Sequence, residues 1–146
     1  MNVAALAIAD ISDGDVDDVI VLWQRCGLTR PWNDPAADIA LARRNTNSTV
    51  LVGRDGDTIV ATAMVGHDGH RGWVYYVAVD PARQKKGFGR AIMAAAEQWL
   101  RQAGLPKLQL MVRRENAKAG AFYRSIGYEE SDTVVFAKWI DGRNGT

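Results

Sequence analysis

The chain has 146 residues, of which 47% are hydrophobic and 24% are charged. These proportions are ordinary for a globular protein and exclude a disordered or collagen-like chain. The length fits one domain over residues 1–146, with enough chain to bury a sizeable core. Lysine and arginine total 18 against 17 acidic residues, a formal net charge of +1. This balance argues against a surface built for nucleic acid or anionic lipid.

Cys26 is the only cysteine. An intramolecular disulfide and a cysteine-based zinc site are therefore excluded. No apolar run approaches the ~20 residues that span a bilayer, and the short stretch Val3–Ile8 lacks the preceding basic residue of a secretory signal. We expect a cytoplasmic protein with no membrane partner.

The first quarter of the chain predicts a strand followed by two helices. Leu6–Ile11 is short and apolar, as in a strand. A helix is expected over Val16–Cys26, with Asp13 as its cap and Gly27 just past its end. Its core-facing stripe has helical spacing: Val16, Val19, Ile20 and Trp23. The loop Arg30–Pro35 follows. A second short helix is expected to begin at Pro35, with Asp34 as its cap, and to end near Arg44.

The middle of the chain predicts a three-stranded meander. Thr49–Gly53 and Thr58–Gly66 are rich in β-branched residues, and the Asp55-Gly56 pair between them favours a tight hairpin. After the turn His67–Gly72, the segment Gly72–Val79 supplies a third strand, which Asp80-Pro81 ends.

The last third predicts helix, strand, helix and strand. A strong helix is expected over Gly89–Ala103, and Lys107–Arg113 alternates like a strand. A short helix over Ala117–Ile126 and strand material over Thr133–Trp139 complete the order, before a polar tail after Asp141. The expected fold class is therefore α/β, a mixed and mostly antiparallel sheet flanked by about four helices.

The most informative segment is Tyr75–Arg90, where a strand ends, a loop with two glycines follows and a helix begins. Unpaired amides and the positive end of the helix dipole favour an anion there. Gly87 and Gly89 would let a phosphate approach the backbone, and Lys85, Lys86 and Arg90 add charge. The loop lacks the ending of a Walker motif and the third glycine of a dinucleotide fingerprint. A solvated basic turn is the alternative reading of this segment alone.

Two blocks resemble the GNAT superfamily of acetyl-CoA-dependent N-acetyltransferases. Val77-Ala78-Val79-Asp80-Pro81 followed by Gln84-Lys85-Lys86-Gly87-Phe88-Gly89-Arg90 is similar to its acetyl-CoA motif. Asn116, with Ala121-Phe122-Tyr123-Arg124-Ser125-Ile126-Gly127-Tyr128, is similar to its second block. Through Arg30–Pro35 and Asp68–Gly72, the chain looks closest to small bacterial YpeA-like acetyltransferases.

The resemblance implies a role for each matching position. The backbone of Val77, Ala78 and Val79 would pair with the pantetheine arm and donate to the thioester carbonyl. The amides of the glycine loop would hold the pyrophosphate: Gln84, Lys85, Lys86, Gly87, Phe88, Gly89 and Arg90. Asn116 would contact the cofactor arm, and Tyr123 would protonate the leaving thiolate. Acetyl-CoA is thus the expected co-substrate, with no metal.

The chain departs from the family pattern at one position. Some relatives carry a glutamate as general base five residues before the asparagine, where this chain has Met111. A missing base disfavours lysine, whose amine has a pKa of ~10.4, more than an α-amine of pKa ~7.8. A base from another segment is the alternative. Without the family resemblance, the residues favour reading Tyr123 as a half-buried aromatic on an amphipathic helix.

The acceptor is expected beside the Arg30–Asp34 loop. Trp32 would offer a flat wall and Asp34 would attract an ammonium group or take its proton. The competing interpretation is that Asp34 only caps the second helix. His67 and His70 share a turn without an evident third ligand, so no metal site is expected. Cys26 is expected to be a small buried hydrophobic side chain rather than a nucleophile.

Two functions remain open at this point. The first is an N-acetyltransferase that moves the acetyl group of acetyl-CoA directly to a primary amine in a ternary complex. That amine would belong to a protein N-terminus, a lysine or a small molecule. The second is a non-catalytic acyl-CoA-binding sensor or interaction module on the same scaffold. No nucleic-acid partner is expected, and a homodimer is one option for the assembly.

Overall fold

The computed structural model describes residues 6–143. Residues 3–5 of the stretch Val3–Ile8 and the end of the polar tail lie outside these residues. The chain divides into two compact units, Met1–Leu110 and Met111–Thr146.

The first unit contains the sheet and three helices. Its strands are β1 (Ala7–Asp10), β2 (Ser48–Asp55), β3 (Thr58–His67), β4 (Gly72–Val79) and β5 (Leu108–Gln109). Its helices are α1 (Val16–Arg25), α2 (Pro35–Arg43) and α3 (Phe88–Gln102), with short 3-10 turns at Asp13–Asp15 and Pro81–Arg83. The strands lie in the order β1-β2-β3-β4-β5, all antiparallel except for the parallel pair β4–β5. The predicted mixed, mostly antiparallel sheet is confirmed.

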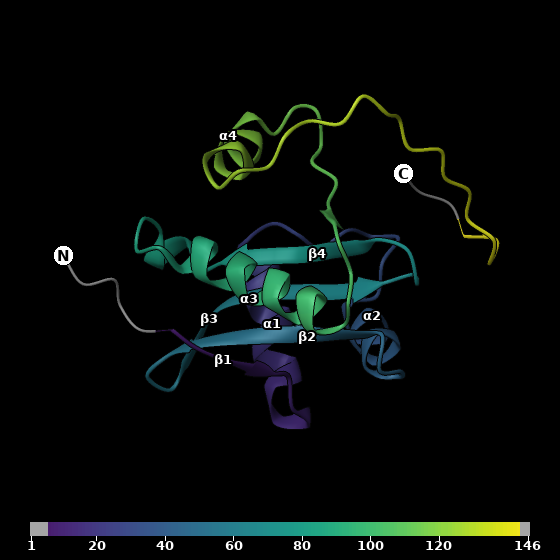
Figure 1. The fold of residues 1–146 in the computed structure, drawn as a ribbon. Coiled ribbons are helices and arrows are strands. Elements are labelled where there is room, and N and C mark those ends of the chain that lie inside the picture. The colour runs from purple at the N-terminus through teal and green to yellow at the C-terminus, as the bar shows by residue number, and fades with distance from the viewer. Residues whose placement is uncertain (1–5, 144–146) are drawn as a thin grey trace. The chain divides into compact units, whose positions relative to one another are not determined.

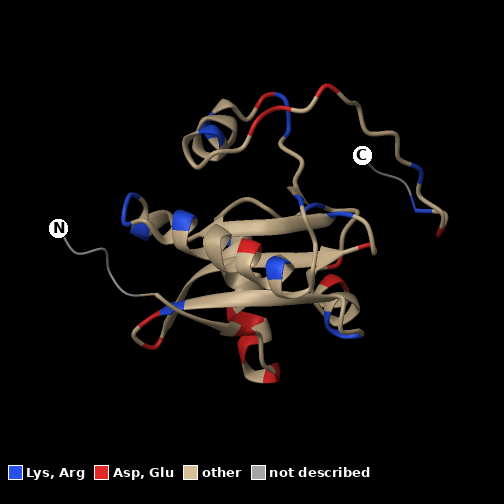
Figure 2. Cartoon of the chain, viewed as in Figure 1, with Lys and Arg blue, Asp and Glu red and all other residues tan. Residues whose placement is uncertain are grey.

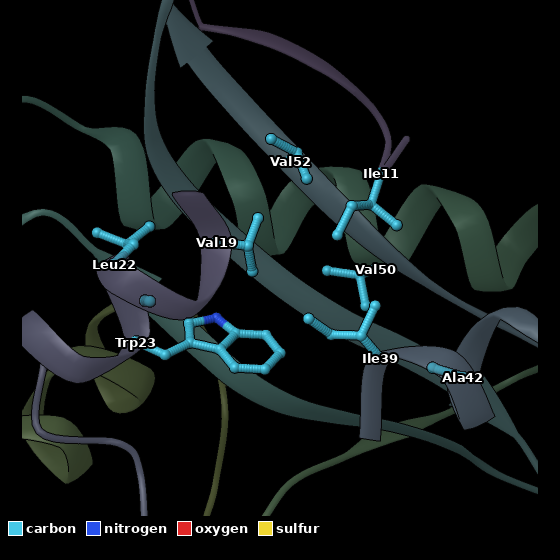
Figure 3. Close-up of a cluster of buried hydrophobic side chains, with 9 residues drawn as sticks. Ile11, Val19, Leu22, Trp23, Ile39, Ala42, Val50 and Val52 are labelled. Carbon is cyan, nitrogen blue, oxygen red and sulfur yellow. The ribbon is translucent and has the colours of Figure 1, made fainter. Parts of the chain in front are cut away.

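Helices cover both faces of this sheet (Figure 1). α1 and α2 pack on one face, where Val19, Leu22 and Trp23 meet Ile39, Val50 and Val52 (Figure 3). α3 covers the other face, with a buried stripe of Phe88, Ile92, Met93, Ala96 and Leu100. Gly72 permits this packing, because a Cβ there would lie 2.4 Å from Leu100 Cδ1. No helix in residues 6–143 is long and apolar enough to cross a membrane.

The start of α1 differs from the expectation at its N-cap. Asp13 was expected to cap this helix, but the N-cap of α1 is Asp15, and Ser12 is the N-cap of the 3-10 turn that precedes it. The Ser12 N–H donates to the Asp15 carboxylate at 2.9 Å. Asp13 instead accepts a hydrogen bond from Arg43 of α2 at 2.8 Å. The predicted cap at Asp13 is wrong because Asp13–Asp15 form a 3-10 turn before α1 begins.

The second unit contains α4 (Ala117–Ser125), which begins as predicted and ends one residue before the predicted Ile126. The Asn116 side chain caps it by accepting from the Ala119 N–H at 3.1 Å, and Gly127 has a φ of 100° just past its end. The rings of Phe122 and Tyr128 lie edge-on to Tyr123, with centroids 5.0 and 5.9 Å away.

Of the predicted strands, one is shorter than expected and one does not form. The strand expected over Lys107–Arg113 is limited to the two residues of β5, which pair with the first two residues of β4. Thr133–Trp139 forms no strand, and Val134 and Phe136 are 72% and 92% exposed. An apolar or β-branched composition shows only that a segment fits a sheet; a strand also needs a hydrogen-bonding neighbour.

Candidate functional site

The second half of β4 has an open edge. β4 pairs with β3 along most of its length, but it pairs with β5 only at Gly72↔Leu108 and Trp73↔Gln109. Within residues 6–143, no strand therefore follows that edge of β4 from Val74 to Val79. Backbone N–H and C=O groups on an open edge can pair with an added extended ligand.

A β-bulge lies within this open half. Thr62 pairs with Ala78 and Met64 with Tyr75, so Tyr76 and Val77 together oppose Ala63. Tyr76 has a φ of +51°, in the left-handed region that non-glycine residues avoid at a cost of about 1–2 kcal/mol. A bulge bends its strand and re-aims the neighbouring groups, and bulges concentrate near functional sites.

Three contacts hold Tyr76 in this conformation. Its ring stacks on Trp23 of α1, with centroids 3.8 Å apart and planes 5° apart. Its hydroxyl donates to Asp38 of α2 at 2.7 Å, and its carbonyl accepts from the Thr62 hydroxyl at 2.9 Å. Burial, together with the Asp38 carboxylate, raises the pKa of Tyr76 above its ordinary value. The tyrosine therefore stays neutral and keeps its hydrogen bond.

The turn after β4 is held by α1. Asp80 is 5% exposed; its carboxylate pairs with Arg25 at 2.9 Å and accepts from the Ala82 N–H at 2.9 Å. The Val79 carbonyl accepts from the Cys26 thiol at 3.3 Å and from the Gln84 side-chain amide at 3.0 Å. The last residues of β4 are thus fixed before the glycine loop begins.

The glycine loop ends at the start of α3. Gly87 is the N-cap with a φ of 81°, and Lys85 also has a positive φ, of 65°. The first amides of α3 have no acceptor within the helix, and the helix dipole places partial positive charge there. Lys85, Lys86 and Arg90 are exposed at the same place, where basic residues gather in Figure 2. The segment has the chemistry of an anion site.

Asn116 and Tyr123 both lie in the second unit. Asn116 caps α4, and Tyr123 lies within that helix and is half-buried. Burial raises the pKa of Tyr123 to about 12. The phenol is therefore protonated at neutral pH, as a proton donor must be. Met111, at the position where some relatives carry a base, is 51% exposed.

The loop before α2 is built as the sequence predicts. Asp34 is the N-cap of α2, and its carboxylate accepts from the Ala37 N–H at 3.2 Å. Its capping role is confirmed, whereas a role toward an acceptor stays a prediction. Trp32 is half-buried in the same loop. No group of three metal-ligating side chains occurs in the described part of the chain.

The sequence did not predict that Thr62 and Asp38 both bond to Tyr76. Trp23 was expected in the core, and it is fully buried. The signal for the bulge is the pair Tyr75-Tyr76, which interrupts the alternation of β4. A bulge adds one residue to its strand, so the regular alternation of side chains between the two faces is interrupted there.

The sequence pattern of the acetyltransferase (GNAT) family matches residues 16–128. An acetyltransferase of Yersinia pestis (strain Pestoides F) is 40% identical over 124 residues, which cover 85% of this chain and 88% of that protein. The chain belongs to the GNAT family of acetyltransferases. It is accordingly an acetyl-CoA-dependent acyltransferase.

Solved structures agree on the fold. The aminoglycoside N-acetyltransferase AAC(6')-Iy in complex with CoA has a TM-score of 0.81 at 14% identity, over 93% of this chain and 95% of that one. A ribosomal-protein alanine N-acetyltransferase of Escherichia coli has a TM-score of 0.74 at 25% identity, over 87% of this chain and 79% of that one. The GNAT fold read from the two sequence blocks is confirmed.

Cys26 provides a test of the contact between α1 and β4. Burial raises the pKa of its thiol, and the nearby Asp80 carboxylate raises it further. A raised thiol pKa leaves less thiolate at a given pH, and only the thiolate is alkylated. We expect iodoacetamide to modify the native chain more slowly than the urea-unfolded chain at pH 8, with a higher pH midpoint. A native midpoint at or below that of the unfolded chain would contradict the buried contact.

Proposed function

We propose that the chain transfers the acetyl group of acetyl-CoA directly to a primary amine in a ternary complex, as one domain over residues 1–146. The observation that carries this proposal is the succession of an open, bulged edge on β4 and an anion-binding helix start. CoA is an elongated molecule with an amide-containing arm and a pyrophosphate. The edge suits the arm and the helix start suits the pyrophosphate.

The cofactor would be held mainly by backbone groups. Val77, Ala78 and Val79 would pair with the pantetheine arm, and one of their amides would donate to the thioester carbonyl. The amides from Gln84 to Arg90 would bind the pyrophosphate. The Gln84 side chain already bonds to the Val79 carbonyl, so it links these two parts of the site. Asn116 would contact the arm, besides capping α4.

The chemistry requires orientation, carbonyl polarisation and two proton movements. A neutral amine attacks the thioester carbonyl carbon, a new C–N bond forms, and the C–S bond breaks to release CoA thiolate. Tyr123 would give its proton to that sulfur and regain one from solvent, and the amine loses one proton to solvent or a base. Positioning and fixed donors supply most of such an acceleration, and a general acid adds about 10²–10⁴-fold.

The acceptor proposed here is an amine of low pKa. Met111 cannot take a proton, so this position supplies no general base and an amine that is readily neutral is favoured. Deprotonation at pH 7 costs about 1 kcal/mol for an α-amine of pKa ~7.8 and about 4.6 kcal/mol for a lysine of pKa ~10.4. The E. coli neighbour is named for acetylating an alanine. The acceptor would enter beside Trp32 and Asp34, whose carboxylate attracts an ammonium group.

The function is tested by thiol release from acetyl-CoA across a panel of amines. The panel holds an alanine-initiated peptide, a peptide with a blocked N-terminus and one lysine, and an aminoglycoside. We expect turnover to be fastest with the alanine-initiated peptide, because its amine is most readily neutral. Fastest turnover with the lysine peptide would contradict the low-pKa acceptor. CoA binding without turnover of any amine would favour a ligand-binding module over an enzyme.

The glycine loop is tested by Gly89→Val. Gly89 lies in the first turn of α3, and the added side chain would cover amides that the pyrophosphate approaches. We expect CoA affinity, measured by calorimetry, to fall about tenfold or more at little change in melting temperature. Gly87→Val is a poorer probe because Gly87 has a φ of 81°, where valine is strained.

The control for this variant is Gly14→Val. A Cβ on Gly14 meets no atom within 4 Å, so the same replacement is made away from the loop. We expect Gly14→Val to bind CoA like the wild type. Unchanged affinity in a folded Gly89→Val protein would remove the pyrophosphate from the start of α3.

The proton donor is tested by Tyr123→Phe, which removes only the hydroxyl. We expect kcat to fall by about 10²-fold, within the general-acid range, at nearly unchanged affinity for acetyl-CoA. Because the pKa of Tyr123 is raised to about 12, the wild type should show no loss of kcat from its ionisation below about pH 11. Tyr128→Phe, which removes a hydroxyl from the neighbouring ring, should keep kcat. Full kcat in Tyr123→Phe would leave Tyr123 a packing residue.

A further inference from the structure

Thr62 carries a buried hydroxyl in the middle of β3, between two hydrogen bonds. The side chain is 0% exposed, as is that of Trp23. The Trp23 indole N–H donates to Thr62 Oγ1 at 2.8 Å, and Thr62 Oγ1 donates to the Tyr76 carbonyl at 2.9 Å. An indole N–H can only donate, so the hydroxyl accepts from it and its own proton is directed at the carbonyl. The direction of this short chain is therefore unambiguous.

The bond to Tyr76 fixes the orientation of one peptide group. The Tyr76 carbonyl and the Val77 N–H belong to the same planar trans peptide, in which they point in opposite directions. No cis peptide occurs among the described residues. Because Thr62 draws the Tyr76 oxygen toward Trp23 and α1, the Val77 N–H points away from Thr62. The Thr62 hydroxyl thus decides where the Val77 N–H is aimed.

This peptide needs a restraint of its own. Tyr76 and Val77 form the bulge opposite Ala63, and Tyr76 has its φ of +51° there. The stacking on Trp23 and the bond to Asp38 hold the Tyr76 side chain. Of the three contacts described for Tyr76, the bond from Thr62 is the one that holds its backbone.

We propose that Thr62 is a positioning residue for acetyl transfer, whose hydroxyl aims the Val77 N–H at the thioester carbonyl of acetyl-CoA. This proposal rests on the proposed function, because it takes Val77 as the donor to that carbonyl. A fixed donor is most effective where negative charge develops, which here is the thioester oxygen as the amine attacks. Losing one such donor typically lowers kcat about 10²–10³-fold. A Val77 N–H that is present but misdirected should lower kcat by less than this.

Two variants of Thr62 separate its hydroxyl from its volume. Thr62→Val has nearly the same shape but neither accepts from Trp23 nor donates to Tyr76. Thr62→Ser keeps the hydroxyl and loses one methyl group. Thr62→Val leaves the buried indole N–H without its acceptor and should melt at a lower temperature. Both variants are therefore compared with the wild type well below the lowest melting temperature of the three.

The first measurement is turnover with the best amine of the panel, together with CoA affinity. CoA has no acetyl carbonyl, so the orientation of the Val77 N–H should affect turnover more than CoA binding. We expect Thr62→Val to lose about tenfold or more in kcat with CoA affinity within about twofold of the wild type. Thr62→Ser should recover kcat to within about threefold. A residue that only stabilises the fold would not separate kcat from CoA affinity.

The second measurement needs no acceptor. A carbon-13 label on the acetyl carbonyl allows the stretch of bound acetyl-CoA to be isolated by difference infrared spectroscopy. A stronger hydrogen bond lowers this frequency, so the band should lie lower in the wild type and in Thr62→Ser than in Thr62→Val.

The proposal is overturned if folded Thr62→Val keeps the kcat and the carbonyl frequency of the wild type. It is also overturned if Thr62→Ser loses as much as Thr62→Val, or if kcat and CoA affinity fall together. A wild type that binds acetyl-CoA without turning over any amine would sink the proposed function instead. In that case the infrared comparison alone decides the role of Thr62.

Discussion

The packing of Tyr76 against Trp23 is the interaction on which the candidate site depends. A tyrosine with a φ of +51° is unfavourable in isolation, so neighbouring contacts must hold it. Stacking at 3.8 Å against a fully buried tryptophan ties this backbone conformation to the largest side chain of the core. A core substitution under α1 would therefore reach the open edge of β4 through the stacked ring of Tyr76.

α1 is more than a cover for the sheet, because three of its contacts hold successive points of β4 and the following turn. Trp23 stacks on Tyr76, Cys26 donates to the Val79 carbonyl, and Arg25 pairs with the buried Asp80. These contacts fix the strand where it leaves the sheet and begins the glycine loop. Tyr76 also bonds to Asp38, so the helix that Asp34 caps is joined to the same bulge. The loop expected to receive the acceptor and the strand expected to hold the thioester are thus mechanically linked.

Local patterns predicted the elements of this chain, and long-range contacts explain what they missed. The Asp34-Pro35 start of α2, the Asp55-Gly56 turn and the glycine loop were predicted because each depends on a few adjacent residues. Thr62 looked like an ordinary strand residue, since its partners lie 39 and 14 positions away in Trp23 and Tyr76. The strand predicted over Thr133–Trp139 was wrong for the opposite reason: its composition is a local property, whereas a strand requires a neighbour. The roles of Asn116 and Tyr123 came from family resemblance, because a capping asparagine and a helical tyrosine carry no chemical signal of their own.

Where a ligand is bound by backbone amides, the residues that set the direction of those amides need not contact the ligand. Every non-proline residue has a backbone N–H donor, so the identity of the side chain at Val77 does not reveal whether that donor is used. What can vary is the direction of the amide, and here that direction follows from a carbonyl held by a buried hydroxyl. The hydroxyl is directed in turn by an indole that also stacks on the strained tyrosine. Selection on the proposed thioester contact would therefore act on Trp23, Thr62 and Tyr76 together, since all three hold the same peptide group.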